Sequence, residues 1–252
     1  MFFFFKRKKI VVDCFVHNQA IKDLYPIESS NKFIPDWYKS MPSTFTDTTP
    51  YGLTYKSPTI KHCIAFNATF KTGFMIPLFT DIHIQIDDDD NWSFQAANRT
   101  VEIHQHIHEQ VPKKIHEKYN HIKIISPWLI KEKTGVNFSW NQPSWNHIYE
   151  LPNYHILPGV INFKYQHNSN INILLTRFKQ NIIIKAGTPM MHLIPISNDE
   201  VIIKNHVIDF HEWHSIGSSS IAAYHSKFVG NYMHNKKIID EREKKCPFGF
   251  GK

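Results

Sequence analysis

Residues Leu157–Ile196 read LPGVINFKYQHNSNINILLTRFKQNIIIKAGTPMMHLIPI, and this stretch decides the fold. Two β-branched apolar runs are separated by polar and charged residues, and the second ends in Ala-Gly-Thr-Pro before the apolar run that begins at Met190. Such a pattern predicts a strand, a turn and a returning strand. The stretch contains no nucleophile with its base, no phosphate-binding loop and no paired-cysteine metal motif. It therefore predicts a fold without predicting a reaction.

The clearest alternation of apolar and polar residues runs from Met75 to Ile86 and predicts one strand. Period two places successive side chains on opposite faces, so one face is expected in the core and the other outside it. The apolar face comprises Ile76, Leu78, Thr80, Ile82, Ile84 and Ile86, and the polar face comprises Asp81, His83 and Gln85.

Similar patterns predict further strands on both sides of this one. They are Ile10–Phe15, Trp92–Ala96, Val101–His108, Ile122–Ile130 and a strand that begins at Asn137. Trp92–Ala96 follows the acidic turn Asp87–Asp90 and is expected to form a hairpin with the Met75–Ile86 strand. Ser126-Pro127-Trp128 lies inside Ile122–Ile130, where the proline indicates an edge or a bulge.

Prolines at 26, 35, 42, 50 and 58 exclude long helices near the N-terminus, so residues 1–60 are expected to wrap the core. Residues 61–210 are expected to form a β-rich core, followed by a helix over 218–243 that Ser218–Ser220 can cap. We predict a mainly β chain with a single domain over 1–252. The architecture is expected to be an antiparallel β-sandwich or barrel of jelly-roll or β-clip type.

Composition favours a protein partner over a nucleic acid. The formal net charge is +7, but much of the excess lies near the two ends, in Lys6-Arg7-Lys8-Lys9 and in the lysines at 236, 237, 244 and 245. Nucleic-acid binding is not expected without a clustered basic patch. Three widely spaced cysteines predict no disulfide framework. Met1–Phe5 is too short for a signal-peptide core or a membrane span, so neither secretion nor membrane insertion is expected.

One strand carries the most tempting candidate for a metal site. Period two places Glu102, His104, His106 and His108 on one face, and His83 with Asp81 could add ligands from a neighbouring strand. Imidazoles with one carboxylate resemble the iron site of a cupin-like Fe/2-oxoglutarate-type oxygenase, with Mn or Zn as other possible ions. The competing interpretation is a solvent-facing strand, for which no cofactor is expected.

The remaining candidates favour structural interpretations. A second group of histidines comprises His147, His155, His167 and His192. Of these, His192 lies between Met191 and Leu193 and is expected to be a buried structural histidine rather than a ligand or base. Trp128, Trp140 and Trp145 suit core or interface packing. Ser218–Ser220 suits a helix cap, and Asp87–Asp90 suits a solvated turn because it lacks EF-hand spacing.

Several short motifs together resemble proteins of unknown function from marine tailed phages, namely cyanophages and pelagiphages. They are Pro35-Asp36-Trp37-Tyr38-Lys39, Thr59–Cys63, Gly73–Pro77 with Thr80-Asp81, Ser126-Pro127-Trp128, Pro158–Asn162 and Gly187–Met190 with His192–Pro195. This resemblance covers about residues 35–196. It implies a viral origin and a compact β-rich fold, and it implies no activity.

A second, local resemblance covers residues 158–196. Gly159-Val160-Ile161-Asn162, Tyr165, Gly187 and His192-Leu193-Ile194 are similar to the third motif and following strands of the trimeric dUTPase family, which implies a β-clip. Asn162 stands where that family has its water-activating Asp, and Gln166-His167 replaces Arg-Gly. We therefore expect no dUTP hydrolysis.

The sequence as a whole predicts a non-enzymatic phage protein of structural or host-interaction type that acts through a β-rich surface. The expected partner is a virion or host protein, with a homo-oligomer as a further possibility. The expected location is the host cytoplasm or the virion. The oxygenase described above is the alternative function.

Overall fold

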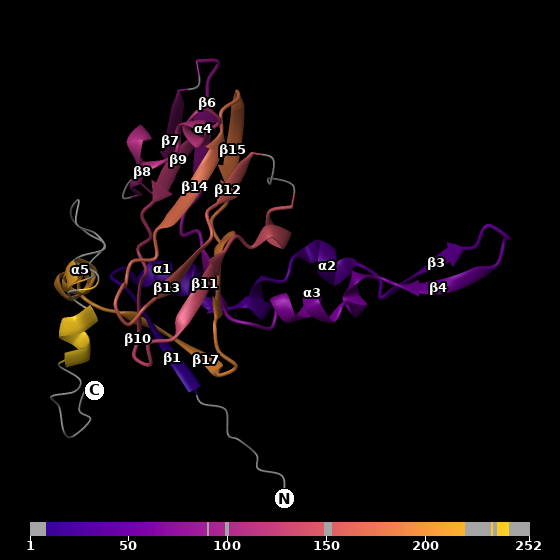
Figure 1. Cartoon of the computed structure of the whole chain (residues 1–252), viewed down its shortest axis with the longest axis horizontal. Coiled ribbons are helices and arrows are strands. Elements are labelled where there is room, and N and C mark those ends of the chain that lie inside the picture. Colours follow the sequence, from indigo (N-terminus) through magenta and orange to yellow (C-terminus); the bar gives the residue numbers. More distant parts are fainter. Residues whose placement is uncertain are drawn as a thin grey trace, which may run out of the picture.

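A computed structural model describes residues 9–89, 91–98, 101–148, 153–219, 233 and 236–241. Its strands form a β-rich body, from which a narrow arm projects to one side (Figure 1). All strand pairs are antiparallel except β1 with β17, which are parallel. The mainly β, antiparallel fold class is thus confirmed.

The body contains four sheets. Their strand orders are β13 (Gly159–Asn162), β11 (Asn137–Asn141), β16 (Pro189–Pro195), β5 (Phe74–Pro77) and β2 (Glu28–Ser29); β12 (Tyr154–Ile156), β14 (Ile171–Thr176), β9 (Tyr119–Ile124) and β8 (Ile103–Gln105); β10 (Leu129–Glu132), β1 (Lys9–Val16) and β17 (Glu200–Val207); and β15 (Gln180–Ile184), β6 (Ile82–Ile86) and β7 (Trp92–Ala96). Each described sheet has two edge strands and does not close into a barrel, which is consistent with a sandwich.

Helices are short and connect the sheets. They are α1 (Gln19–Leu24), α4 (Lys113–His116), α5 (Phe210–Ser219), and the 3-10 turns η1 (Ser30–Phe33), η3 (His108–Gln110) and η4 (Ser144–Asn146) in the body, with α2 (Asp36–Ser40), η2 (Ile60–His62) and α3 (Ile64–Thr69) in the arm. The arm also contains the fifth sheet, the hairpin of β3 (Thr44–Thr48) and β4 (Thr54–Pro58).

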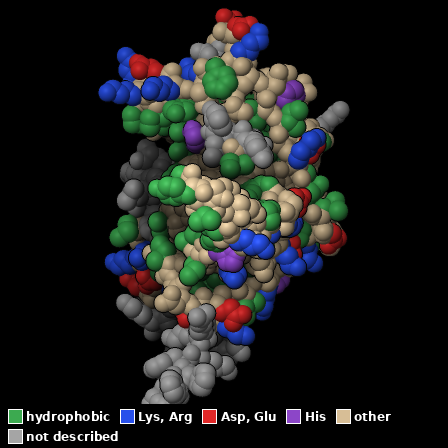
Figure 2. All heavy atoms as spheres, turned by 90° about the vertical axis from the view of Figure 1, so that its right-hand side faces the viewer, with side chains coloured by type: hydrophobic (Ala, Val, Ile, Leu, Met, Phe, Trp, Pro, Cys, Tyr) green, Lys and Arg blue, Asp and Glu red, His purple; other side chains and the backbone are tan. Residues whose placement is uncertain are grey.

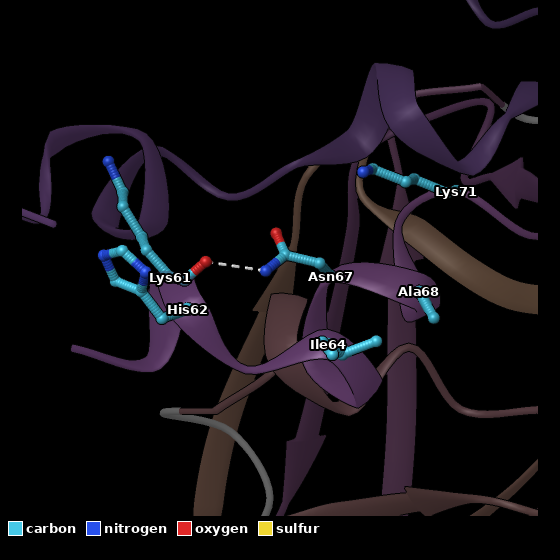
Figure 3. A pocket seen from close by; sticks show the side chains of 6 residues that line it. All are labelled: Lys61, His62, Ile64, Asn67, Ala68 and Lys71. Carbon is cyan, nitrogen blue, oxygen red and sulfur yellow. Dashed lines mark hydrogen bonds between the residues drawn. The ribbon is translucent and has the colours of Figure 1, made fainter. Parts of the chain in front are cut away.

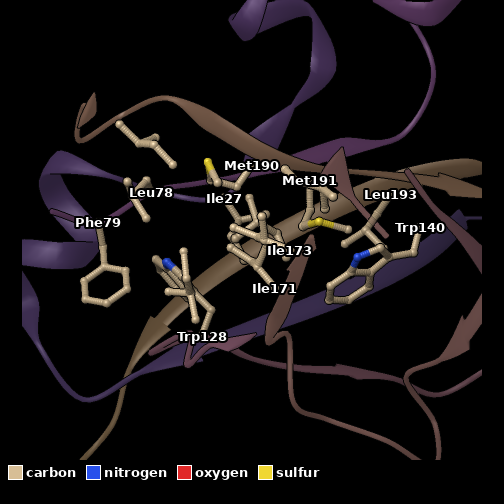
Figure 4. Packing of buried hydrophobic residues seen from close by; sticks show 14 of the residues in the cluster. Ile27, Leu78, Phe79, Trp128, Trp140, Ile171, Ile173, Met190, Met191 and Leu193 are labelled. Carbon is tan, nitrogen blue, oxygen red and sulfur yellow. The ribbon is translucent and has the colours of Figure 1, made fainter. Parts of the chain in front are cut away.

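One large hydrophobic core joins the sheets of the body. Strand β16 contributes Met190, Met191 and Leu193, which are all fully buried, as is Trp128. These side chains meet aliphatic residues from β14 and from the segments that flank β5 and β2 (Figure 4). Residues Leu157–Ile196, which include β14 and β16, therefore contribute to the centre of the core.

The predicted strand from Met75 to Ile86 is two strands. β5 ends at Pro77, and the chain passes from the five-stranded sheet to a three-stranded one before β6 begins at Ile82. In the connection, the Leu78 amide donates to Thr188 O at 2.8 Å, and the Thr80 hydroxyl accepts from the Asn98 amide at 3.1 Å. In the sequence, Leu78 and Thr80 continue the predicted apolar face, so the pattern gives no sign of the bend, although Pro77 and Phe79 are buried there as well.

The predicted faces of β6 are correct. Ile82 and Ile84 are 0% exposed, whereas Gln85 is exposed and His83 is partly buried. The hairpin of β6 with β7 also forms as expected, with Ile84 opposite Phe94.

Two other predicted strands are shorter than expected. Ile122–Ile130 is split because β9 ends at Ile124 and β10 begins at Leu129 in a different sheet. Between them, the Ser126 hydroxyl accepts from the Trp128 amide at 3.2 Å. Val101–His108 retains only β8, because the chain turns into η3 at His108.

A helix that the sequence did not predict, α5, comes before most of the predicted 218–243 segment, of which residues 233 and 236–241 are described and helical. α5 starts at Phe210, where Asp209 accepts a hydrogen bond from the Glu212 amide at 2.9 Å. Asp209, rather than Ser218–Ser220, therefore caps it. Residues 220–232, 234–235 and 242–252 of the predicted 218–243 helix and its tail lie outside the described residues, as do Met1–Lys8.

Candidate interaction surface

The arm, residues 36–70, is built on a small aromatic cluster of its own. Tyr38, Phe66 and Phe70 are buried together, separately from the main core. We call these three residues the anchor cluster. The Tyr38 and Phe66 rings are 5.1 Å apart between centroids, and those of Phe66 and Phe70 are 5.4 Å apart. Such ring pairs add stability beyond the area that they bury.

Side-chain contacts tie the base of the arm to the body. The indole of Trp145 in η4 lies 4.5 Å from the Phe66 ring, and the Trp37 indole N–H donates to Trp145 O at 3.1 Å. The next residue, Asn146, donates its amide to Phe33 O at 2.7 Å. The base of the arm is thereby fixed to the body through side-chain packing and hydrogen bonds.

Beyond this base, the chain forms a hairpin of two strands that, among the described residues, pair only with each other. β3 pairs with β4 in a register that places Asp47 opposite Tyr55, and the Tyr55 hydroxyl donates to Asp47 Oδ2 at 2.9 Å. Gly52 closes the turn with φ +80°, a conformation that favours glycine. Figure 1 shows the hairpin at the far end of the arm, directed away from the body.

Large apolar side chains are exposed along the arm. Tyr51 at the turn is 92% exposed, Ile64 on α3 is 86% and Leu53 is 70%, while Phe45 and Tyr55 are each 48% exposed. Figure 2, which faces the side from which the arm projects, shows hydrophobic side chains on this face among Lys and Arg groups. Single exposed apolar residues are ordinary, but a series of them on one projecting element is typical of a binding surface.

An open pocket of about 450 Å³ lies at the base of the arm. In Figure 3, Lys61 and His62 lie on one side of Asn67 and Lys71 lies on the other, with Ile64 and Ala68 alongside. The Asn67 amide donates to Lys61 O at 2.7 Å, and Lys61 Nζ donates to Lys39 O at 3.0 Å. The pocket therefore combines an apolar wall with cationic groups.

The histidines proposed as metal ligands are distributed over two sheets. His83 lies on β6 between Gln95 and Ile183, whereas His104 lies on β8 opposite Lys123. Asp81 accepts hydrogen bonds from the Ala186 amide and from Lys185 Nζ, each at 2.8 Å, and these bonds lower its pKa. His108 begins η3. Glu102 pairs with His104 at 3.2 Å.

Within the described ranges, no three His, Cys, Asp or Glu side chains are grouped closely enough to hold a metal ion together. The oxygenase alternative stays a hypothesis.

His106 has a partner that the sequence did not indicate. Its ring stacks on that of His121, with centroids 4.0 Å apart, and its Nε2 lies 3.1 Å from Asn172 Oδ1. Burial, together with the adjacent His106, lowers the pKa of His121 to about 4. His121 is therefore expected to be neutral near pH 7.

Three of the four remaining candidate histidines are buried in structural contacts. His147 lies 2.6 Å from both the Tyr154 hydroxyl and Pro189 O, and His192 Nε2 donates to Thr72 O at 2.7 Å. His167 Nδ1 lies 3.1 Å from Ile130 O and from Phe163 O. Burial lowers the pKa of His167 to about 4 and also lowers that of His192. His155 is exposed.

The other sequence candidates have these surroundings. Trp128 is 0% and Trp140 8% exposed, so both belong to the core. Asn162 Nδ2 donates to Gly135 O at 2.8 Å and to Asn137 Oδ1 at 2.9 Å. These contacts join the end of β13 to the start of β11. Asp87 accepts from the Asp89 and Asn91 amides at 2.9 Å, as a turn residue does. Ser218 belongs to α5.

Sequence reasoning predicted a short helical turn at 35–39, which α2 confirms, but it missed the hairpin of the arm. Its signal is the pair of Thr-rich alternating segments at 44–48 and 54–57, which flank Thr49-Pro50-Tyr51-Gly52. A Gly-containing loop of this length between two such runs predicts a hairpin. Neither strand has a strongly apolar face, so the pattern gave no reason to expect a core strand.

The chain matches no protein-family model, and no curated protein is significantly similar to it. None of the described helices is both long enough and apolar enough to span a bilayer.

Proposed function

We propose that this chain is a non-enzymatic structural or interaction protein whose arm binds another protein. The observation that carries the proposal is the arm itself. It is fixed to the body at its base, yet it holds Tyr51, Leu53 and Ile64 in solvent. An isolated two-stranded hairpin is only marginally stable in water, so contact with a partner would both stabilise it and bury its apolar side chains.

The resemblance of residues 35–196 to proteins of marine tailed phages supports a virion or host protein as the partner, in the host cytoplasm or in the particle. The exposed aromatic rings of the arm, those of Phe45, Tyr51 and Tyr55, belong to residue types that are enriched in protein interfaces. The cations of the pocket at its base, Lys61 and Lys71, would complement acidic groups beside an apolar anchor.

Photo-crosslinking tests this function. A benzoylphenylalanine placed at Tyr51 should give covalent adducts with a protein in the cells that produce the chain, and mass spectrometry identifies the adduct. The matched control has the same probe at Gln85, which is exposed on β6 of the body. Adducts that are absent at Tyr51, or equally abundant from Gln85, would contradict a role for the arm.

Removing the hairpin provides a second test. The Thr59 amide donates to Ser43 O at 2.9 Å, so a short Gly-Ser loop can replace residues 44–58 without moving the base. This variant should keep the unfolding free energy of the body and lose the partner found by crosslinking. Retained binding would show that the interaction surface lies elsewhere.

A further inference from the structure

The backbone of the hairpin has two unpaired edges. Within the described residues, β3 and β4 pair only with each other, so each has one row of peptide groups that face solvent. The pairs Ser43–Thr59 and Thr49–Leu53 are bridged by backbone hydrogen bonds. Because hydrogen-bonded and non-hydrogen-bonded pairs alternate in an antiparallel ladder, the outward-facing groups of β3 belong to Thr44, Thr46 and Thr48.

The same alternation assigns Thr54, Lys56 and Pro58 to the outer edge of β4. Pro58 has no N–H to donate, and Lys56 is a charged residue of the kind that discourages edge pairing. The edge of β3 has neither device. Thr44 and Thr46 each offer a donor and an acceptor, and Thr48 offers its carbonyl, because its N–H donates to Asp47 Oδ1 at 2.8 Å. Of the two edges, β3 is therefore the one that can accept another strand.

The sequence of β3 is complementary to itself. Two antiparallel copies of Thr44-Phe45-Thr46-Asp47-Thr48 centred on Thr46 place threonine opposite threonine, and Phe45 opposite Asp47. Threonine pairs are favourable across strands, and no like charges face each other. The same operation on β4 would place Lys56 opposite Lys56, which is repulsive. Electrostatics thus also select β3.

We propose that two copies of this chain associate through β3, so that their hairpins form one continuous four-stranded sheet. The proposal rests on the proposed function, because it names a second copy as the protein that the arm binds. The interface is isologous, with the twofold axis passing beside Thr46. The central Thr46 pair contributes two backbone hydrogen bonds, and each of the two flanking Thr44–Thr48 pairs contributes the one that Thr44 donates. Phe45 and Tyr55 of both copies lie on the same face of the new sheet.

This register also gives the exposed tip a contact. Extrapolated beyond the ends of β3, the register places Tyr51 of one copy level with Met41 of the other. Met41 directly follows α2, and it lies two residues from Lys39, whose carbonyl accepts a hydrogen bond from the pocket residue Lys61. Phe45, Tyr51 and Tyr55 are 48, 92 and 48% exposed, which corresponds to about 300–450 Å². Stable interfaces need roughly 800 Å² per partner, so both the strand pairing and the tip contact are required.

Proline substitution at matched positions tests the pairing. Thr46→Pro removes the central outward N–H of β3, and Lys56→Pro removes the outward N–H of its cross-strand partner in β4. Neither N–H belongs to the β3–β4 ladder. In sedimentation equilibrium at micromolar concentration, the full chain and Lys56→Pro should be dimers, and Thr46→Pro should be at least tenfold weaker. A monomeric full chain, or equal behaviour of the two variants, would overturn the proposal.

A disulfide test does not depend on proline being tolerated. With Cys63 and Cys246 changed to Ser, Thr46→Cys should form a dimer on mild oxidation, because facing residues of a hydrogen-bonded pair have a Cα separation of about 5.5 Å. Lys56→Cys is the control and should form no disulfide-linked dimer under the same conditions, because Lys56 lies on the opposite edge of the hairpin. If neither variant crosslinks while Tyr51 still forms adducts with a different protein, the second copy is excluded and the proposed function stands.

Discussion

The body and the arm place their aromatic side chains in opposite environments. In the body, Trp128, Phe138 and Phe163 are 0% exposed within one core that joins four sheets. In the arm, a three-residue anchor cluster supports a hairpin whose aromatic residues Phe45, Tyr51 and Tyr55 remain exposed. Burial in the body supplies folding stability, whereas the outer arm leaves apolar area exposed to solvent, as the proposed binding role requires.

The largest expected effect lies in the body. Ile84→Asp places an unpaired charge at a position that is 0% exposed, and it should cost at least about 4 kcal/mol or prevent folding. Gln85→Lys, one residue along β6 on the opposite face, should change the unfolding free energy by under about 0.5 kcal/mol. Denaturant unfolding measures both. Equal effects would show that the assignment of faces is wrong.

Opening the anchor cluster should affect the arm without affecting the body. Phe66→Ala is expected to cost about 3–5 kcal/mol of local stability, because it removes a buried ring. Hydrogen exchange should then lose protection in residues 36–70, and body strands such as β16 should keep theirs. Ile64→Ala on the same helix is the control, since Ile64 is 86% exposed. Parallel loss of protection in both regions would show that they unfold as one unit.

Acid should destabilise the body through its buried histidines. Burial lowers the pKa of His167 from 6.5 to about 4, so between these values the unfolded chain binds a proton that the folded chain does not. Stability therefore falls as pH falls through this window, by up to about 3 kcal/mol for this residue. His121 and His192 act with the same sign.

Comparing denaturant unfolding at about pH 7 and about pH 4.5 isolates this contribution. His167→Asn cannot take up the proton and should show a smaller decrease between the two pH values than the native chain. An unchanged decrease would mean that His167 is protonated in the folded state as readily as in the unfolded one.

The smallest effect concerns the histidine face of β8. His104 is exposed and pairs with Glu102, and His106 is half-buried against His121. Changing both His104 and His106 to Gln should alter the unfolding free energy by under about 1 kcal/mol. Elemental analysis accompanies this measurement. A metal bound at one per chain, retained through dialysis and lost in the double variant, would favour the oxygenase over the arm-mediated function.

Local pattern located most of the body but not its breaks. Ile82 and Ile84 were assigned to the core correctly because period two follows from backbone geometry alone. The break between Pro77 and Ile82 was missed because Leu78 and Thr80 continue the alternation and are also buried. Whether a continuous pattern stays in one sheet depends on partners far along the chain, here Thr188 and Asn98.

The candidate sites depended even more on distant partners. The sequence grouped His104 with His106 by spacing, but it could not indicate that His121 stacks on His106. It suggested a structural role for His192, and the hydrogen bond of this residue to Thr72 agrees with that interpretation. The contacts of His147 with Tyr154 and Pro189 had no signal in the sequence. The hairpin of the arm was missed because its two strands are exposed on both faces and therefore give no amphipathic signal.

The sequence by itself determined the β-rich class, the faces of β6 and the hairpin of β6 with β7, because side-chain alternation and turn chemistry are local properties. The order Thr-Phe-Thr-Asp-Thr also makes β3 of the arm hairpin complementary to itself in the proposed antiparallel register. Only the tertiary structure decided that this hairpin stands away from the core. That outcome depends on the anchor cluster, where Phe66 packs on Trp145 from a segment about eighty residues further along the chain.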